Sequence, residues 1–135
     1  MKFSAFATLL VSVAAAQAAD TEDDIALLPA PAKLTRGSGA FVLTDKTPIV
    51  AGPGTESEAE TLAARLRVPT GFALRVTDGN PPDGCIELAL DGSLEPALGG
   101  EGYRLSVGAA RVRISAASKA GLFYGGVTFC QLLPP

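Results

Sequence analysis

The chain of 135 residues contains no histidine, no tryptophan, one methionine and two cysteines. Without histidine, no Ser-His or Cys-His arrangement is available for nucleophilic catalysis. Two distant cysteines without histidine also give no ligand spacing for zinc. These absences remove the commonest nucleophilic and metal-dependent chemistries, and we expect no metal or other cofactor.

An excess of positive charge is also lacking, since 11 Lys and Arg residues stand against 14 Asp and Glu residues and the net charge is −3. No basic stretch is present, so we expect no nucleic-acid partner. Arg104, Arg111 and Arg113 alternate with apolar residues, which is typical of the solvated face of a sheet. Hydrophobic residues make up 47% of the chain and charged residues 19%, which favours a packed globular domain.

An apolar run near the N-terminus, from Ala5 to Ala16, follows Lys2 and precedes Ala16-Gln17-Ala18. A basic start, a short apolar stretch and a small-x-small site are typical of a secretory signal peptide. The run is too short to cross a hydrocarbon core of ~30 Å, so we expect no membrane anchor. We predict a signal peptide at residues 1–18 and export to a secreted, periplasmic or lysosome-like compartment. A buried N-terminal helix is the alternative.

After a flexible acidic leader at residues 19–27, we predict one domain at residues 28–135. Residues 41–44 and 48–50 are expected to be extended. A helix is expected to start at Thr55 or Ser57, whose hydroxyl would form a capping box with a glutamate three residues later. The helix would bury Ala59, Leu62, Ala63 and Leu66 and end at Pro69 and Gly71.

Four segments then alternate apolar and polar residues with a period of two. Residues 72–76, 85–90, 103–107 and 112–116 are predicted to be strands, and the last two are predicted to form a hairpin. The apolar positions Phe72, Leu74, Val76, Ile86, Leu88 and Leu90 would face inward. One covered face indicates an α+β fold with a mainly antiparallel sheet and two helices packed on one face.

The last predicted helix, residues 118–133, has Ser118 as its expected N-cap and Lys119 as its only charge. A helix that is apolar nearly all round is usually buried between two layers. Gly121, Gly125 and Gly126 each weaken it by up to ~1 kcal/mol relative to alanine, so we expect another backbone to approach it closely. We predict that something outside this small domain covers part of the helix.

No residue stands out as catalytic, cofactor-binding or metal-binding. The glutamates near the first helix are explained by its macrodipole, and the remaining carboxylates are expected on the surface. Neighbouring Ser118 and Lys119 do not face each other on a helix. The glycines at residues 99–102 precede a strand, so they lack the context of a phosphate loop. The carboxylates concerned are Glu56, Glu58, Glu60, Glu87, Asp91, Glu95 and Glu101.

Three aromatic residues and the two cysteines leave alternatives open. Tyr103, Phe123 and Tyr124 could stack on sugar rings, but we favour core positions for them because aromatic residues are few. Cys85 and Cys130 could form a disulfide in an exported protein, or each could be a small buried hydrophobe.

Several motifs together resemble one family. Leu28-Pro29-Ala30-Pro31 before Phe41-Val42-Leu43, the helix ending at Thr70-Gly71, Glu101-Gly102-Tyr103-Arg104-Leu105, and the segment from Ala117 to Pro134 carry the similarity. They resemble the N-terminal domain of family 20 β-N-acetylhexosaminidases over Leu27–Pro135. Val127 and Cys130 depart from residues that are more usual in the family.

The resemblance implies that this domain precedes a (β/α)₈ barrel in which an adjacent Asp-Glu pair performs substrate-assisted cleavage. This chain has no Asp-Glu dipeptide and no barrel, so no catalytic residue carries over and the chain alone is expected to be inactive. The resemblance also implies that the last helix lies against the barrel. We expect that contact to use Leu122, Gly125, Gly126, Phe129 and Leu133.

Two other functions remain open from the sequence. One is a stand-alone carbohydrate-binding module. The other is an interaction domain that docks on a separately encoded barrel through residues 122–133.

Overall fold

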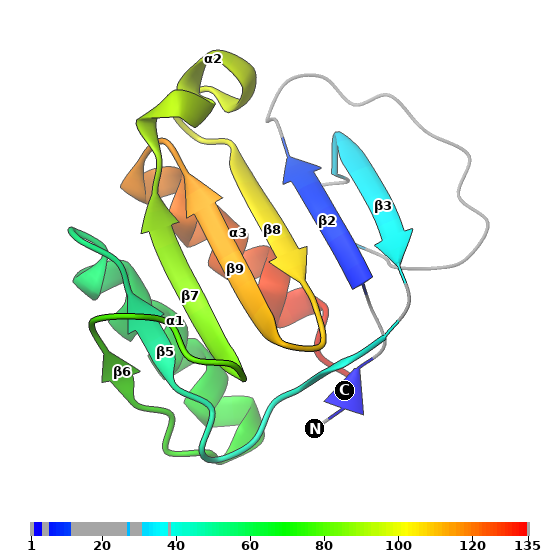
Figure 1. Ribbon diagram of the computed structural model, residues 1–135, viewed down its shortest axis with the longest axis vertical. Helices are drawn as coiled ribbons and strands as arrows, with labels where there is room; N and C mark the ends of the chain where they lie inside the picture. The colour runs from blue at the N-terminus through cyan, green and yellow to red at the C-terminus, as the bar shows by residue number, and fades with distance from the viewer. Residues whose placement is uncertain (1, 4–5, 12–26, 28–30, 38, 135) are drawn as a thin grey trace.

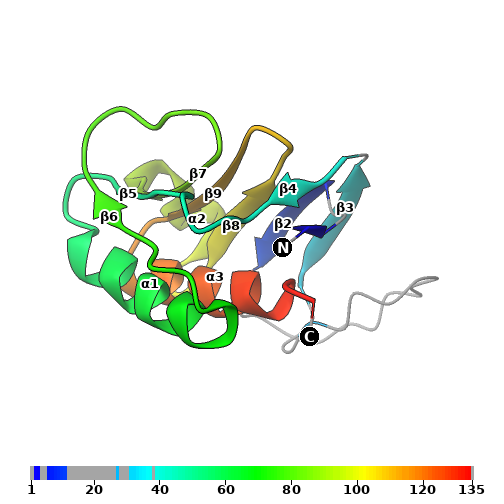
Figure 2. The same ribbon diagram turned by 90° about the horizontal axis from the view of Figure 1, so that it is seen from below.

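The computed structural model describes residues 2–3, 6–11, 27, 31–37 and 39–134. In this part of the chain, two long helices cover one face of a sheet (Figures 1 and 2). The predicted α+β class, with two helices on one face, is confirmed. The elements are β1 (Lys2–Phe3), β2 (Phe6–Val11), β3 (Lys33–Gly37), β4 (Phe41–Val42), β5 (Ile49–Ala51), α1 (Glu56–Thr70), β6 (Val76–Thr77), β7 (Cys85–Leu90), η1 (Gly92–Leu94), α2 (Glu95–Leu98), β8 (Tyr103–Val107), β9 (Arg111–Ala116) and α3 (Lys119–Gln131).

The main sheet has the strand order β3-β2-β8-β9-β7-β5-β6. Neighbouring strands from β3 to β9 are antiparallel, whereas those from β9 to β6 are parallel. The sheet is therefore mixed, which corrects the expectation of a mainly antiparallel one. The helical crossover through α1 returns the chain to the sheet so that β5 and β6 run in the same direction. β7 and β9 are parallel because β8, which lies between them in sequence, pairs with the other side of β9.

The start of α1 differs in detail from the predicted capping box. Thr55 is the N-cap, but its hydroxyl donates to the Gly52 carbonyl at 2.8 Å instead of capping the helix. The Ser57 hydroxyl donates to the Glu58 carboxylate at 2.9 Å. Glu56 and Glu58 lie in the first turn, where the helix dipole stabilises negative charge.

The rest of α1 follows the sequence pattern. The predicted face, Ala59, Leu62, Ala63 and Leu66, is buried. Pro69 lies inside the last turn, and the helix ends at Gly71, whose φ of 68° is in the left-handed region. Its N–H donates to the Arg67 carbonyl at 2.9 Å, as a C-terminal cap.

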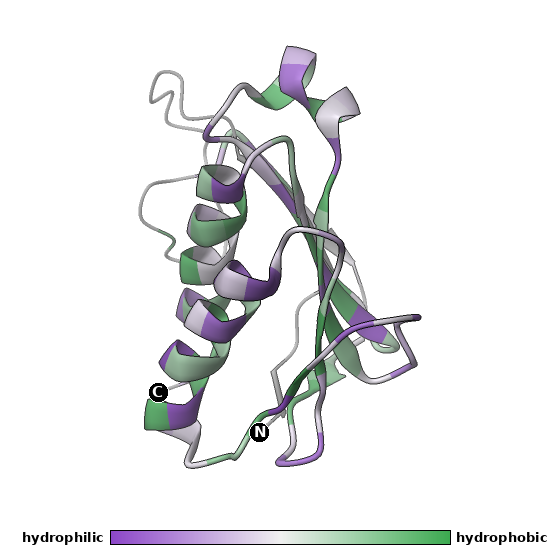
Figure 3. Cartoon of the chain, turned by 90° about the vertical axis from the view of Figure 1, so that its left-hand side faces the viewer, coloured by the Kyte–Doolittle hydropathy of each residue, from purple (hydrophilic) through white to green (hydrophobic). Residues whose placement is uncertain are grey.

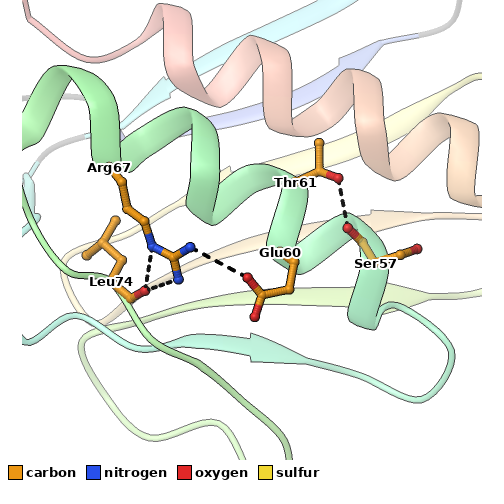
Figure 4. A network of polar contacts seen from close by, with 5 residues as sticks. All are labelled: Ser57, Glu60, Thr61, Arg67 and Leu74. Atoms are coloured by element: carbon orange, nitrogen blue, oxygen red, sulfur yellow. Dashed lines mark hydrogen bonds and ion pairs between the residues drawn. The ribbon is translucent and has the colours of Figure 1, made fainter.

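Residues 72–75 do not form the predicted strand; only Val76–Thr77 do. The carbonyl of Leu74 instead accepts hydrogen bonds from Arg67 Nε at 3.1 Å and Nη2 at 2.6 Å. The same guanidinium lies 3.6 Å from the Glu60 carboxylate on α1 (Figure 4). A side chain thus takes the place of a strand partner, while Leu74 stays buried and Phe72 and Val76 pack against the core.

Strands β7, β8 and β9 match the predicted segments, and β8 and β9 form the predicted hairpin. Ile86 and Leu88 point into the core, but Leu90 is 38% exposed at the end of β7, which corrects its inward assignment. Both the strands and the helices carry apolar residues (Figure 3), and their buried side chains form one core cluster. The largest fully buried side chains are Tyr103, Phe41, Phe129, Leu43, Ile49, Leu66, Leu74, Ile86, Leu88, Leu105 and Ile114.

The predicted cap of α3 is confirmed, since the Ser118 hydroxyl accepts a hydrogen bond from the Gly121 N–H at 3.2 Å. The Ser118 hydroxyl also donates to the carbonyl of Gly100, which ties the start of α3 to the loop before β8. Elements β1, β2, β3, η1 and α2 were not predicted from the sequence.

The N-terminal segment contributes two of the described strands. β2 lies between β3 and β8 and pairs with both in antiparallel fashion. This arrangement is that of the full-length chain. The predicted leader lies outside the described residues except for Leu27, which is buried in the core.

Candidate functional site

The predicted contact residues of α3 lie mostly inside the domain. Leu122 and Phe129 are fully buried in the core. A Cβ at Gly125 would lie 2.5 Å from Ile114 Cγ2 and 3.2 Å from the Tyr103 ring, and one at Gly126 would contact Leu62 of α1. These four residues therefore contact this domain's own sheet and α1, which corrects the prediction that they contact a barrel. For Leu133, the fifth residue predicted, the barrel contact stays a prediction.

Gly121 shows the same close approach at the start of α3. A Cβ there would collide with the Gly102 carbonyl oxygen and would lie 2.7 Å from the Ala116 Cβ. The expectation that another backbone approaches the helix is confirmed, but that backbone belongs to the loop before β8. Leu133 is half-buried just beyond the end of α3.

An aromatic surface remains on the helix layer. Phe123 and Tyr124 on α3 are 39% and 41% exposed, so their predicted core positions are wrong. Their rings make an edge-to-face contact with centroids 5.6 Å apart. The Arg65 guanidinium of α1 lies 5.0 Å from the centroid of Phe123, within the range of a cation–π contact. We call Arg65, Phe123 and Tyr124 the helix-layer patch.

Tyr103, the third aromatic residue considered, has the predicted core position. Its hydroxyl shares a buried hydrogen bond with the Thr128 hydroxyl of α3. Burial raises the pKa of Tyr103, and the hydrogen bond opposes this in part. The phenol therefore serves to join the sheet to the helix, and it offers no platform for a ligand.

The predicted surface carboxylates do not assemble into an acid–base pair. Asp91 accepts hydrogen bonds from the Ser93 N–H at 3.0 Å and the Ser93 hydroxyl at 2.5 Å, which lower its pKa. Asp91 thereby caps the short helix η1. Glu56, Glu60, Glu95 and Glu101 are exposed and Glu58 is half-buried.

Glu87 is the exception, because its side chain is only 12% exposed, which corrects the expectation of a solvated position. Its Oε2 lies 3.8 Å from Nη1 of Arg111. Arg111 also lies 3.4 Å from Asp83 in the loop between β6 and β7, the loop that arches over the outer face of the sheet in Figure 2. This group of charges links the loop to the sheet, and the buried Glu87 Oε2 has the ion pair with Arg111 but no hydrogen-bond partner among the described residues. Arg104 and Arg113 are exposed on the same outer face, as predicted.

One groove of about 650 Å³ lies beside the turn before β5. The buried Thr47 hydroxyl accepts a hydrogen bond from the Thr44 N–H at 2.9 Å and so fixes this turn. The lining carries charge of both signs but no aromatic ring, so it lacks the stacking surface that sugar recognition commonly uses. The lining residues are Asp45, Lys46, Thr47, Pro48, Gly71, Ala73, Arg75 and Thr77.

Cys85 and Cys130 are free thiols. Burial raises the pKa of both; Arg111 opposes this at Cys85 and Arg65 opposes it at Cys130. A raised pKa lowers the thiolate fraction, so neither thiol is activated as a nucleophile. Of the two alternatives, the structure favours the small buried hydrophobe.

The described residues offer no group of three or more His, Cys, Asp or Glu side chains that could hold a metal ion. Among the described helices, none has both the length and the apolar character to cross a bilayer. What this part of the chain presents is a packed scaffold with an aromatic helix surface.

Comparison with known proteins gives one consistent result. Residues 24–135 match the model of glycosyl hydrolase family 20, domain 2. A lacto-N-biosidase of Bifidobacterium bifidum is 31% identical over 108 residues, which cover 80% of this chain and 10% of the relative. A β-hexosaminidase of Porphyromonas gingivalis is 34% identical over 120 residues, covering 87% of this chain and 15% of the relative.

Solved structures agree with these relatives. The family 20 β-N-acetylhexosaminidase of Streptomyces coelicolor A3(2) superposes with a TM-score of 0.69 at 38% identity, over 80% of this chain and 21% of that one. The N-acetyl-β-hexosaminidase of Streptomyces plicatus gives 0.59 at 40% identity, over 68% and 18%. The chain thus spans between a tenth and about a fifth of the proteins that it matches.

Proposed function

Because this chain belongs to glycosyl hydrolase family 20, through that family's domain 2, we propose that it is a non-catalytic scaffold domain of a β-N-acetylhexosaminidase. Such an enzyme removes terminal N-acetylhexosamine residues from glycans. The observation that carries the proposal is the match over residues 24–135 together with the small share of each relative that the match covers. The substrate chemistry belongs to the remainder of such an enzyme.

The geometry of the described residues supports a scaffold role. The carboxylates are capping, paired or solvated, and the buried phenol and thiols have raised pKa values with structural contacts. A general acid or nucleophile would need a neighbouring base or an opposing charge within a cleft. Activity of the assembled enzyme would therefore depend on this domain for folding and positioning.

We propose the helix-layer patch as the surface that contacts the catalytic domain. Phe123 and Tyr124 are large, rigid and exposed, and Arg65 lies over one of the rings. Aromatic residues and arginine are enriched at the energetically important centres of interfaces. The occupant is a (β/α)₈ catalytic domain of family 20, whether on the same chain or on another.

Coexpression tests this contact. The catalytic domain of the Streptomyces coelicolor enzyme, without its own N-terminal domain, would be produced with and without this chain, and soluble yield and co-elution would be measured. We expect this chain to raise the yield and to co-elute. Phe123→Asp with Tyr124→Asp should abolish co-elution, whereas Val42→Asp, at another exposed hydrophobic residue outside the helix layer, should not. Equal co-elution of all three forms would contradict the proposed surface.

A carbohydrate-binding module is less well supported, because the described groove lacks aromatic residues. Titration with chitin oligomers tests it directly. Saturable binding would favour the module, and its absence is what the scaffold proposal expects.

We also propose that the chain is exported and that residues 1–18 are removed. The support is the basic start, the apolar run and the small-x-small site at Ala16-Gln17-Ala18, together with a family match that starts at residue 24. Intact mass of the product from an exporting host tests this; a mass that still contains residues 1–18 would contradict it.

A further inference from the structure

One strand of the main sheet belongs to the segment for which we propose removal on export. β2, Phe6–Val11, lies between β3 and β8 and is hydrogen-bonded to both. The family match covers residues 24–135, so β2 lies outside the part of the chain that the family shares. Removal of β2 would leave β8 without a neighbour on one side.

The registers of β3 and β8 against β2 show how β3 and β8 are aligned with each other. Thr8 pairs with Thr35 of β3 on one side and with Ser106 of β8 on the other. Leu9 pairs in the same way with Leu34 and Leu105. β3 and β8 therefore run parallel to each other. Residues 33–36 and residues 104–107 pair with the same four residues of β2, so the two strands are in register.

We propose that, once β2 has been removed, β3 moves sideways by one strand and pairs with β8 in parallel, without a change of register. The inference rests on the export proposed above. Full-length precursor and mature protein would then differ in the edge of the same sheet, and proteolytic removal of the N-terminus would switch one form to the other.

Side-chain alternation is preserved by such a move. Residues that lie directly opposite each other on paired strands point to the same face of the sheet. A shift of the pairing by one residue would turn every side chain of the shifted strand to the other face. Leu34 packs against the core at the edge of the sheet, in the row of the fully buried Leu105. In the proposed pairing these two leucines become direct neighbours on the core face, whereas Thr35 and Ser106 become neighbours on the opposite face.

The energetics favour the move. A bare edge at β8 would expose a row of backbone donors and acceptors next to the core, which proteins avoid by pairing or covering the edge. Parallel pairing is already present in this sheet between β9, β7 and β5. The replacement strand is tethered nearby, because the chain after β3 passes Gly39, at a φ of 112°, and enters the core at Phe41.

Disulfide trapping tests the pairing. Strands are about 4.8 Å apart, so residues two strands apart are separated by roughly 10 Å, whereas a disulfide needs Cα atoms within about 7 Å. Thr35→Cys with Ser106→Cys, in a Cys85→Ala and Cys130→Ala background, should form no bridge in the full-length chain made in the cytoplasm. The exported protein should form it nearly completely on mild oxidation. Thr8→Cys with Ser106→Cys is the matched control and should bridge in the full-length chain.

Intact mass and amide exchange separate the outcomes. A shortened product with the Thr35–Ser106 bridge, and with the β8 amides still protected, supports the proposal. A shortened product without that bridge overturns it while the export proposal stands, and loss of β8 protection would identify a bare edge. A product that retains residues 1–18 overturns both.

Discussion

The hydroxyl of Tyr103 in β8 shares a buried hydrogen bond with the hydroxyl of Thr128 in α3. Gly125 lies one turn earlier on α3 and leaves room for the Tyr103 ring. This contact joins the sheet to α3. The apolar composition of α3 had predicted that this helix would need a partner outside the domain. The stability of the domain should therefore depend on it in several measurable ways.

Removal of both hydroxyls should cost less stability than the sum of the two single removals, Tyr103→Phe and Thr128→Val. Tyr103→Phe leaves the Thr128 hydroxyl buried without its partner, so we expect a loss of about 1–3 kcal/mol in the free energy of unfolding. Tyr103→Phe with Thr128→Val removes both polar groups and should cost less than the sum of the single changes. Urea unfolding of the three variants measures this, and strict additivity would contradict the direct bond.

The same phenol makes stability depend on pH. Burial raises the pKa of Tyr103 above its unfolded value, so the native state favours the neutral phenol. This contribution is fully present below about pH 10, the ordinary tyrosine pKa, and is lost as pH rises toward the folded pKa. The fall in unfolding free energy above pH 10 should be smaller in Tyr103→Phe than in the wild type, and an identical slope would contradict the desolvated phenol.

The glycines of α3 offer a matched pair of variants. Gly125→Ala places a methyl group 2.5 Å from Ile114 Cγ2, whereas Gly126→Ala places one 3.4 Å from Leu62 Cδ1. Both gain up to about 1 kcal/mol of helix propensity, but overpacking at Gly125 should cost about 1–3 kcal/mol. We expect Gly126→Ala to be neutral or stabilising and Gly125→Ala to be the less stable of the two in thermal melts. If Gly125→Ala were the more stable of the two variants, the position of α3 on the sheet would be contradicted.

Capping at Ser118 should be measurable against an exposed serine. Ser118→Ala removes the acceptor for the Gly121 N–H and should cost about 1 kcal/mol of stability. Ser57→Ala removes a surface contact with Glu58 and should change stability by less than about 0.5 kcal/mol. Denaturant midpoints of the two variants provide the comparison.

The free thiols should report on the fold. Cys85 is fully buried and Cys130 is half-buried, and both have raised pKa values. We expect slow reaction with a thiol reagent at pH 8 in the native protein and rapid reaction of both in denaturant. Cys130 should react first, and a single mass 2 Da lower under native conditions would instead reveal a disulfide.

Local patterns in the sequence predicted much of this fold. Alternation located β7, β8 and β9, and the face of α1 and the cap of α3 followed from spacing and residue type. The parallel half of the sheet was missed because alternation shows which face is covered and not which way a neighbouring strand runs. Residues 72–75 were missed because the partner of the Leu74 carbonyl is a side chain seven positions away.

The surfaces of α3 show the same limit. A helix that is apolar on all sides predicts burial, but composition does not say which side each neighbour occupies. The glycines were assigned to an external contact, although their neighbours are Gly102, Ile114 and Leu62 of this domain. Phe123 and Tyr124 were assigned to the core because composition also does not show which side of such a helix is exposed.

The central claim is that this domain of family 20 supports catalysis without performing it. The most direct test is the release of p-nitrophenol from p-nitrophenyl N-acetyl-β-D-glucosaminide by the purified, folded chain. We expect no rate above the buffer control at any enzyme concentration. A rate that is proportional to the concentration of the chain and saturates with substrate would contradict the account.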